Sequence, residues 1–536
     1  MPSHAARLLL VLASAASLSA CSNDPEPEPT PTPPPDTTPY DGPWTPLGES
    51  GDWTDPGPLA ACSAGATECG SPSSFNMSGC DTGSLDTLER QNAIYRAEIR
   101  YEVPNNTGGV TPAPSSGGFQ LDNNGQPRIV LGLTPSNSLV GPGAFFASAE
   151  QPRNNINLDR WTFAGCQATG PRTLTGCIAW CRNGQLRFRG TFRAERMAWR
   201  PGETESQGLQ LVSESRVQLG LPVDVYVTKG HAYVVSIPNN VRPGGLTVFN
   251  VSDPAQPVQG VSVTRPNDSY WNGVWAKDDA LYIASGDTGV LVYDITNPAQ
   301  PTFALRANTG TAGALDVHTV FVEGNRLYAM SPSARQTFVF DVSTPLKPQL
   351  LASYAHPSVT TGYPHDAFAY GGRLYVNHTV DGFLVVDLDA ASPTLLGQYT
   401  YPYTYSHANA VGTFNGRTIA FEGGERLGAH LRVLDVTDPG SIAKIGEYKL
   451  RGVTSIHNMV LAGTRLYVAH YHEGVRVIDV ADPSQPREVA YFNSFRETDL
   501  GRGDGMYEGA IGMRVPGDGH LYVVDTARGL LILDEP

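Results

Sequence analysis

The residues of this chain best suited to coordination chemistry are histidines and carboxylates that recur at fixed distances from a repeated Leu-Tyr pair. His318, His365 and His457 each stand ten residues before the tyrosine of such a pair, and His378 and His470 stand three residues after it. Imidazole and carboxylate together suit zinc, copper, iron or manganese. Groups at equal positions of a repeat can converge on one face, so the sequence predicts a shared metal site. Its candidate ligands are His318, His365, His378, His407, Glu422, His457, His470 and Glu508, with His430, His472 and Asp525 nearby.

Two other interpretations of these residues remain open. A polar residue at the start of a repeated strand is often structural, because it forms a hydrogen bond to the neighbouring repeat. Alternatively, a histidine acts as a general base without bound metal, with Glu508 or Glu422 as the acid. No G-x-S-x-G, Walker or H-E-x-x-H motif is present to decide between them, so no catalytic residue is assigned.

The spacing of these groups comes from an internal repeat in the C-terminal part of the chain. A strand that ends in Asp or Asn and is followed by Pro returns every 44 to 55 residues, as in LTVFNVSDPAQP (246–257) and VRVIDVADPSQP (475–486). Four short strands with alternating apolar residues fit each repeat, which is typical of a propeller blade. The recurring Asp can accept hydrogen bonds from the turn that follows it; calcium binding is the alternative.

The number of repeats predicts how the ring closes. Six complete repeats lie between Val223 and Phe492, and a seventh ends at Pro536 directly after its third strand. The segment LQLVSESRV (209–217) has the pattern of a fourth strand without the first three, and its pairing with the last strand would leave no free edge. The sequence therefore predicts an all-β fold, with a seven-bladed β-propeller over 205–536 that is closed by strand exchange.

The blades resemble the LVIVD repeat family, on the strength of motifs such as RVIDV (476–480) and LVVDL (384–388). The resemblance covers residues 209–536. It implies a bacterial surface or exported propeller, and it brings no catalytic pattern with it.

Residues 45–200 have a different pattern, which predicts a smaller antiparallel β-sandwich or barrel. Its candidate strands include IYRAEIRYEV (94–103) and WTFAGC (161–166), and the stretch 105–118 is predicted to be a flexible loop. Six of the seven cysteines lie in this region, and an even number in an exported protein indicates three disulfides, whose connectivity the sequence leaves open. The cysteines are Cys62, Cys69, Cys80, Cys166, Cys177 and Cys181.

The first 44 residues predict export and anchoring. Residues 1–20 have the short apolar run of a signal peptide, too short to span a bilayer. The sequence Leu-Ser-Ala-Cys that ends at Cys21 resembles a bacterial lipobox, which implies lipidation of Cys21 and, because Ser22 follows, an outer-membrane location in the cell envelope. Residues 21–44 form a Pro-rich linker that favours extended polyproline II.

Composition and architecture leave three functional hypotheses. The net charge of −15 argues against nucleic acid as a partner. The first hypothesis is a membrane-anchored lipoprotein whose propeller binds an unidentified protein or small-molecule ligand. The second is a metal-dependent exported enzyme, a hydrolase or an oxidoreductase, that uses the His/Glu cluster. The third is a structural envelope protein.

Overall fold

The computed structural model describes residues 43–536 with short gaps at 66–68, 155, 311–314 and 389–391. The expectations for the signal peptide, for Cys21 and for most of the linker lie outside these residues. Residues 39–536 form one compact unit. Within the described part the helices are three short 3-10 turns, η1 (Pro72–Ser74), η2 (Thr82–Thr87) and η3 (Pro439–Ser441), and none of them is long and apolar enough to cross a bilayer.

The N-terminal part is a single, nearly closed antiparallel sheet with the strand order β5-β4-β3-β10-β9-β8-β7-β6. Large apolar side chains such as Tyr95, Phe119, Phe163 and Phe192 are buried between its strands. Two antiparallel strands of two residues each, β1 (Ser63–Ala64) and β2 (Phe75–Asn76), precede it. The strands are β3 (Ile94–Pro104), β4 (Val110–Leu121), β5 (Pro127–Val130), β6 (Pro135–Gly141), β7 (Ala144–Arg153), β8 (Asn157–Gly170), β9 (Thr173–Arg182) and β10 (Gln185–Arg196).

Three disulfides fasten the segment before this sheet to β8 and β9, as the even cysteine count predicts. They join Cys62 to Cys177, Cys69 to Cys181 and Cys80 to Cys166. The expected loop at 105–118 is wrong for most of its length. Residues from Val110 onward belong to β4, which pairs with β3 from Pro104 back to Ile94, so the ladder overrides a sequence rich in Gly, Pro and Ser.

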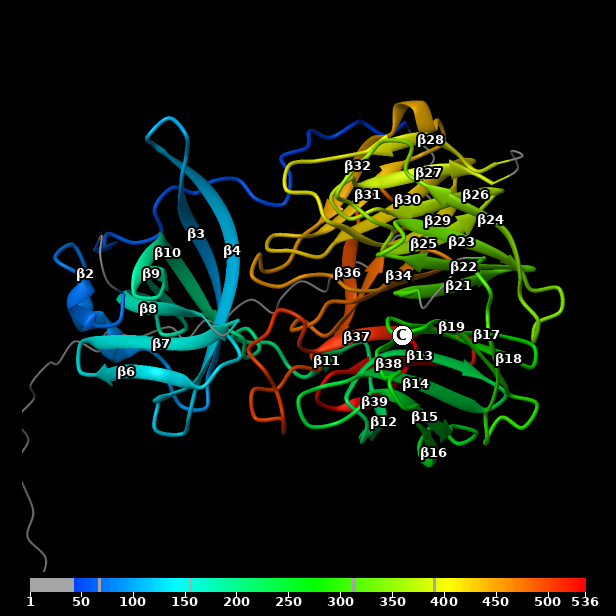
Figure 1. The fold of residues 1–536 in the computed structure, drawn as a ribbon, viewed down its shortest axis with the longest axis horizontal. Coiled ribbons are helices and arrows are strands. Elements are labelled where there is room, and N and C mark those ends of the chain that lie inside the picture. Colours follow the sequence, from blue (N-terminus) through cyan, green and yellow to red (C-terminus); the bar gives the residue numbers. More distant parts are fainter. Residues whose placement is uncertain (1–42, 66–68, 155, 311–314, 389–391) are drawn as a thin grey trace, which may run out of the picture. The chain divides into compact units, whose positions relative to one another are not determined.

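The rest of the chain confirms the predicted seven-bladed propeller, whose blades are separate antiparallel sheets (Figure 1). The first strand of each blade lies innermost and borders the central channel. These inner strands are β13 (Leu221–Thr228), β17 (Trp271–Lys277), β21 (Thr319–Glu323), β25 (Asp366–Tyr370), β29 (Ser406–Phe414), β33 (Met459–Ala462) and β37 (Ala510–Arg514).

The outer strands follow in chain order within each blade. Blade one continues with β14 (His231–Ile237), β15 (Gly245–Asn250) and β16 (Val258–Val263); blade two with β18 (Ala280–Ser285), β19 (Gly289–Asp294) and β20 (Thr302–Arg306); blade three with β22 (Arg326–Ser331), β23 (Gln336–Asp341) and β24 (Gln349–Ala355); blade four with β26 (Arg373–Asn377), β27 (Phe383–Asp387) and β28 (Thr394–Tyr399); blade five with β30 (Arg417–Gly424), β31 (Leu431–Asp435) and β32 (Ala443–Tyr448); blade six with β34 (Arg465–Ala469), β35 (Val475–Asp479) and β36 (Arg487–Phe492); and blade seven with β38 (His520–Asp525) and β39 (Gly529–Asp534).

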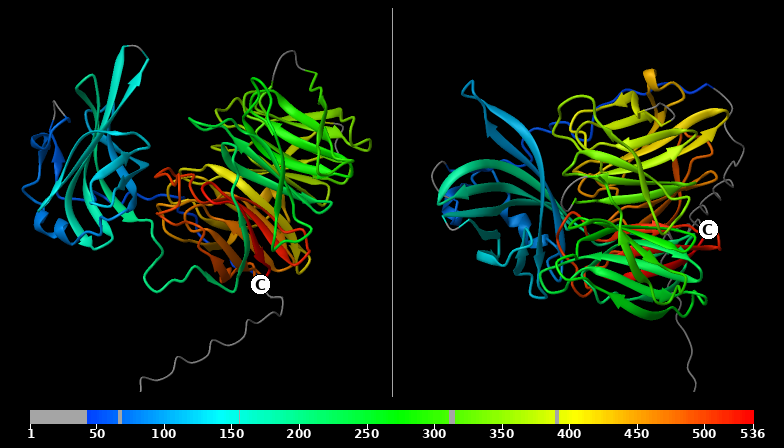
Figure 2. Two further views of the ribbon diagram at one scale, coloured as in Figure 1. Left: turned by 90° about the horizontal axis from the view of Figure 1, so that it is seen from below. Right: turned by 45° about the vertical axis from the view of Figure 1, so that its right-hand side comes forward.

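Strand exchange closes the ring as predicted. β12 (Leu211–Ser215) pairs antiparallel with β39 and becomes the fourth strand of blade seven, and β11 (Ser206–Gln207) adds to β36. Arg528 next to β39 donates to the Glu214 carboxylate at 2.7 Å, so an ion pair accompanies the ladder. In both views of Figure 2 the red C-terminal strands lie against green strands that come some 300 residues earlier, in accord with this pairing.

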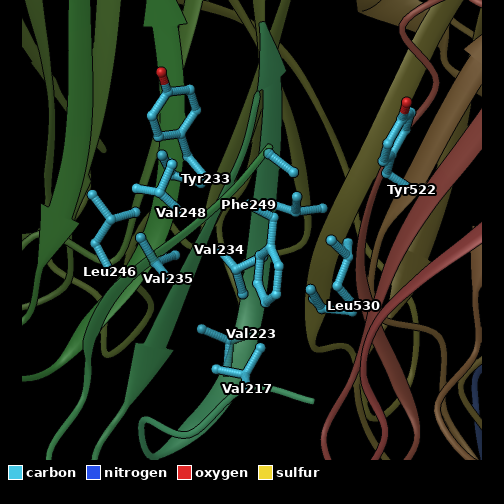
Figure 3. Close-up of a cluster of buried hydrophobic side chains, with 14 of the residues drawn as sticks. Val217, Val223, Tyr233, Val234, Val235, Leu246, Val248, Phe249, Tyr522 and Leu530 are labelled. Atoms are coloured by element: carbon cyan, nitrogen blue, oxygen red, sulfur yellow. The ribbon is translucent and has the colours of Figure 1, made fainter. Parts of the chain in front are cut away.

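Apolar side chains fill the space between adjacent blades. Figure 3 shows the contact of blades one and seven, where Val223, Val234 and Phe249 pack in one cluster with Tyr522 and Leu530. Burial of each such side chain contributes about 1.5–3 kcal/mol.

The recurring Asp has the structural role that the sequence predicts. The carboxylate of Asp294 accepts the amide N–H of Thr296 at 2.7 Å, and Asp341 accepts that of Ser343 at 2.8 Å. Each bond ends the third strand and starts the turn that follows it.

The closure generates a first prediction. Replacing residues 209–217 by a Gly/Ser linker of equal length should lower the melting temperature of the unit 39–536 by at least about 5 °C, because blade seven loses its fourth strand and exposes an edge. Circular dichroism measures the transition. Val241→Ser, which changes a side chain that is 88% exposed, serves as the control. An unchanged melting temperature in the linker variant would contradict the closure.

Candidate metal centre

Each of four successive blades has a histidine at the same height along the channel. Three of these histidines precede their inner strand, and one lies at a β-bulge within it. His318, His365 and His457 stand just before their inner strands, and each donates its backbone N–H to a second-strand carbonyl, at 2.8, 2.8 and 2.9 Å. His407 lies inside β29 at a β-bulge, where the pairing register shifts between Ser406 and Ala408. A bulge leaves one residue out of the ladder and redirects its side chain, so the histidine of blade five reaches the level of the others.

The four imidazoles form a continuous row around the channel. The ring centroids of His318 and His365 are 4.1 Å apart, those of His365 and His407 4.0 Å, and those of His407 and His457 4.6 Å. In blade two Asn272 takes the same position, with its amide nitrogen 3.3 Å from a ring nitrogen of His318. Side chains at matching positions of adjacent blades therefore contact one another in the folded protein.

These histidines are neutral at neutral pH. Burial lowers the pKa of His318 to about 4 and the pKa values of His407 and His457 to about 3, and it also lowers that of His365. A neutral imidazole keeps a lone pair on one ring nitrogen, which is the form that binds a metal ion.

Glu425 completes the cluster, although no register position predicted it. It stands directly after β30, and its carboxylate oxygen lies 3.5 Å from Nε2 of His407. One ligand atom from each of His365, His407 and Glu425 lies within 4.8 Å of the other two. Ligand atoms of a tetrahedral site with bonds of about 2.0–2.1 Å are about 3.3 Å apart, so the His407–Glu425 pair already has nearly that spacing.

Two ring nitrogens of this cluster have no hydrogen-bond partner. His407 Nδ1 lies 3.0 Å from the His457 carbonyl, which only accepts, so Nδ1 carries the proton and Nε2 the lone pair. Among the described residues, Nε2 of His407 and Nδ1 of His365 form no hydrogen bond. A lone pair therefore faces a carboxylate in a buried site, and a proton or a metal ion between the two would remove the repulsion.

Neighbouring groups hold these ligands in place. His457 Nδ1 donates to the Ile511 carbonyl at 2.7 Å, and the Tyr471 hydroxyl donates to the Glu425 carboxylate. Burial raises the pKa of Glu425, and the Tyr471 hydrogen bond opposes that shift. Contacts of this kind orient metal ligands.

The other candidate ligands lie elsewhere in the blades. His378 forms an ion-pair contact with Asp381 at 2.7 Å, and Glu422 accepts from the Tyr401 hydroxyl at 3.0 Å near Arg432. His470 is buried beside Glu473, and Glu508 accepts from the Thr526 hydroxyl at 2.9 Å. These residues are separated from the cluster by their distance from the axis. The position three residues after the Tyr lies at the end of the second strand, one strand further out than the inner strand, and Glu508 lies on a loop.

The residues near the predicted set also have partners of their own. His430 lies 3.5 Å from a carboxylate oxygen of Asp52, the His472 ring contacts Phe495, and Asp525 accepts from Ser494 and Arg502. Cys62, Cys80 and Cys166 form the second compact group of ligand types in the described chain, but all three are in disulfides.

A cavity of about 380 Å³ runs along the channel beside the histidines and is lined by all seven inner strands. His365, His407 and His457 border it where these strands begin. Further along, Arg514 donates to the Asp224 carboxylate at 3.2 Å and lies 4.7 Å from the centre of the Trp275 ring. The channel therefore has an imidazole end and a region of charged and aromatic side chains.

The comparisons with known proteins identify the repeat. The family model described as LVIVD repeat matches residues 270–309 and 457–494, which coincide with blades two and six. The chain carries LVIVD repeats. The resemblance of the sequence to this family is thereby confirmed, and the LVIVD-repeat propeller has seven blades.

No curated protein sequence matches the LVIVD-repeat chain. One similar solved structure is the crystal structure of the computationally designed Ika8 protein, at 11% sequence identity. The alignment covers 61% of this chain and 99% of the Ika8 chain, with a TM-score of 0.42. This degree of likeness carries no argument about function.

The channel ion pair generates a second prediction. Arg514→Met should lower the free energy of unfolding by about 3 kcal/mol, because it leaves the buried Asp224 carboxylate without its cation. The double variant Arg514→Met/Asp224→Asn should recover most of that loss. Urea denaturation followed by tryptophan fluorescence measures both. A single variant within about 0.5 kcal/mol of the parent would contradict the role given to this pair.

Proposed function

We propose that this chain is a binding module whose ligand site is the propeller channel, and that a transition-metal ion binds there to His365, His407 and Glu425. The observation that carries the proposal is the unpartnered Nε2 of His407, 3.5 Å from the Glu425 carboxylate in a buried site. A divalent ion between these atoms satisfies both. His318 and His457 flank the ligands and complete the row of imidazoles.

The donor set narrows the choice of metal. Two imidazoles and one carboxylate form the protein ligand set of several zinc hydrolases and of non-haem iron(II) enzymes. Zinc and iron(II) are therefore our first candidates, followed by copper and manganese. The two histidines would supply nitrogen donors and Glu425 an oxygen donor, and the proposed set contains no thiolate.

A metal-dependent exported enzyme, hydrolase or oxidoreductase, is the second candidate function. Three protein ligands leave an open coordination position that water or substrate fills in catalytic sites. The adjoining cavity of about 380 Å³ offers room for a small substrate next to that position. Turnover by the metal-loaded protein separates this candidate from a binding module.

We further propose that the propeller works outside the cytoplasm, anchored to the outer membrane through a lipid on Cys21. The lipobox-like sequence before Cys21 and the Pro-rich linker after it support the proposal. The three disulfides also support it, because such bonds persist in oxidising compartments. The ligand is a protein or a small molecule; the net charge of −15 disfavours nucleic acid.

The metal proposal is tested on the unit 39–536. Purified from metal-supplemented medium, it should hold close to one equivalent of a transition metal by mass spectrometry of the elements. His407→Ala and Glu425→Gln should each lower the affinity by at least about tenfold, because each removes one of three ligands.

His378→Ala is the matched control, since it removes a buried histidine that lies away from the cluster. It should leave the metal content unchanged. Parent protein without metal after reconstitution, or equal metal loss in all three variants, would reject the metal site.

The anchoring proposal has its own test. In a Gram-negative host, the full chain should appear in the membrane fraction and incorporate labelled palmitate, and Cys21→Ser should do neither, because the thiol that carries the lipid is gone. Ser19→Ala keeps the small residue two positions before Cys21 and is the control. Membrane association of Cys21→Ser equal to that of the parent would contradict a lipid anchor.

A further inference from the structure

One carboxylate in the channel has no cation of its own. Asp366 begins β25 and lines the cavity, where it accepts the Ala367 amide N–H at 2.8 Å. In the part of the chain that the structure describes, no Lys or Arg lies within ion-pair distance of it. Asp224, by contrast, is paired with Arg514. Burial raises the pKa of Asp366 to about 7, because the loss of water disfavours its charged form, so a cation bound beside it would favour the ionised carboxylate.

Aromatic rings also line the channel, on the inner strands of blades one to four. Tyr226, Trp275, Phe321 and Phe368 belong to four successive inner strands, and consecutive ring centroids are 5.2, 5.2 and 5.4 Å apart. Residues two apart on a strand share a face, so the ring of Phe368 follows the Asp366 carboxylate on β25. All four rings border the same cavity.

This arrangement already accommodates one cation. The guanidinium of Arg514 lies 5.6 Å from the centre of the Tyr226 ring and 4.7 Å from that of Trp275. Among the described residues, no Lys or Arg lies over Phe321 or Phe368, the rings next to Asp366. Attraction between a cation and a ring face strengthens when water is displaced, so a ligand that fills the cavity would gain from these rings.

We propose that the channel binds a small organic cation, with its ammonium group at the Asp366 carboxylate and its apolar part against Phe321 and Phe368. A cavity of about 380 Å³ matches the lower end of the range for small-molecule sites. An anion is disfavoured, because Arg514 is already committed to Asp224 and two carboxylates border the same space. This inference rests on the proposed role of the channel as a ligand site, but it does not need the metal ion.

The test compares benzylammonium with benzyl alcohol, its neutral counterpart of similar shape, by isothermal titration calorimetry on the unit 39–536. Measurements are made on the protein as purified and after metal removal by chelation. Benzylammonium should bind the parent more tightly than benzyl alcohol does. Asp366→Asn should weaken benzylammonium binding by about tenfold or more and leave benzyl alcohol binding unchanged.

Asp278→Asn is the matched control, because it removes the same charge from an exposed turn outside the channel. Phe368→Leu keeps an apolar side chain but removes the ring, and it should weaken the cation more than the alcohol. Circular dichroism confirms that each variant is folded.

Equal binding of benzylammonium by the parent and by folded Asp366→Asn, or no binding by the parent, would overturn the inference. Metal content is measured on the same samples. A parent protein that holds one equivalent of metal but does not bind benzylammonium refutes only this inference, and a parent protein that binds benzylammonium but takes up no metal refutes only the metal site.

Discussion

The structure depends on the closure of a ring by β12 and β39. Without that pairing, blade seven lacks its outermost strand and β39 exposes an unpaired edge. With it, seven inner strands are arranged around one axis in the same direction. Residues at the same position of each repeat then lie at the same height along the channel. Residues of adjacent blades that are 44 to 55 positions apart in the sequence therefore become neighbours. The row of histidines is a direct consequence.

The repeat explains what could be predicted and what could not. Hydrophobic alternation and the spacing of the Asp-Pro marker predicted the blades, their number and the closing strand. The position ten residues before the repeated Tyr predicted His318, His365 and His457, because in these blades it lies just before the inner strand. The repeat predicts the height of a residue along the channel but not its distance from the propeller axis. His378, Glu422 and His470 share a register position, yet Glu422 lies in a second strand and the two histidines directly follow one, further from the axis.

Irregular segments were beyond this reasoning. Glu425 reaches the histidines from the loop between β30 and β31, whose length differs from that of the corresponding loop in every other blade, so its place depends on how that one loop folds. A length of sequence rich in Gly, Pro and Ser became β4, because pairing with β3 outweighs local preference. Asp366 and Phe368 were likewise unremarkable in sequence; their meaning comes from facing a shared cavity.

The channel is chemically polarised. Imidazoles from blades three to six gather where the inner strands begin, and aromatic rings from blades one to four follow further along, with an ion pair between Arg514 and Asp224 in the middle. Such an ordering fits a site in which an ion and an organic molecule occupy successive levels. It also accounts for the strong burial of His365 and His407, which are neither apolar nor fully paired.

The most direct test of the central claim is anomalous X-ray diffraction from crystals of the metal-reconstituted protein, recorded on both sides of the absorption edge of the metal. We predict a single strong anomalous peak in the channel, within about 2.0–2.2 Å of a ring nitrogen of His365, Nε2 of His407 and a carboxylate oxygen of Glu425. A channel without such a peak, or a metal bound only elsewhere on the protein, would contradict it.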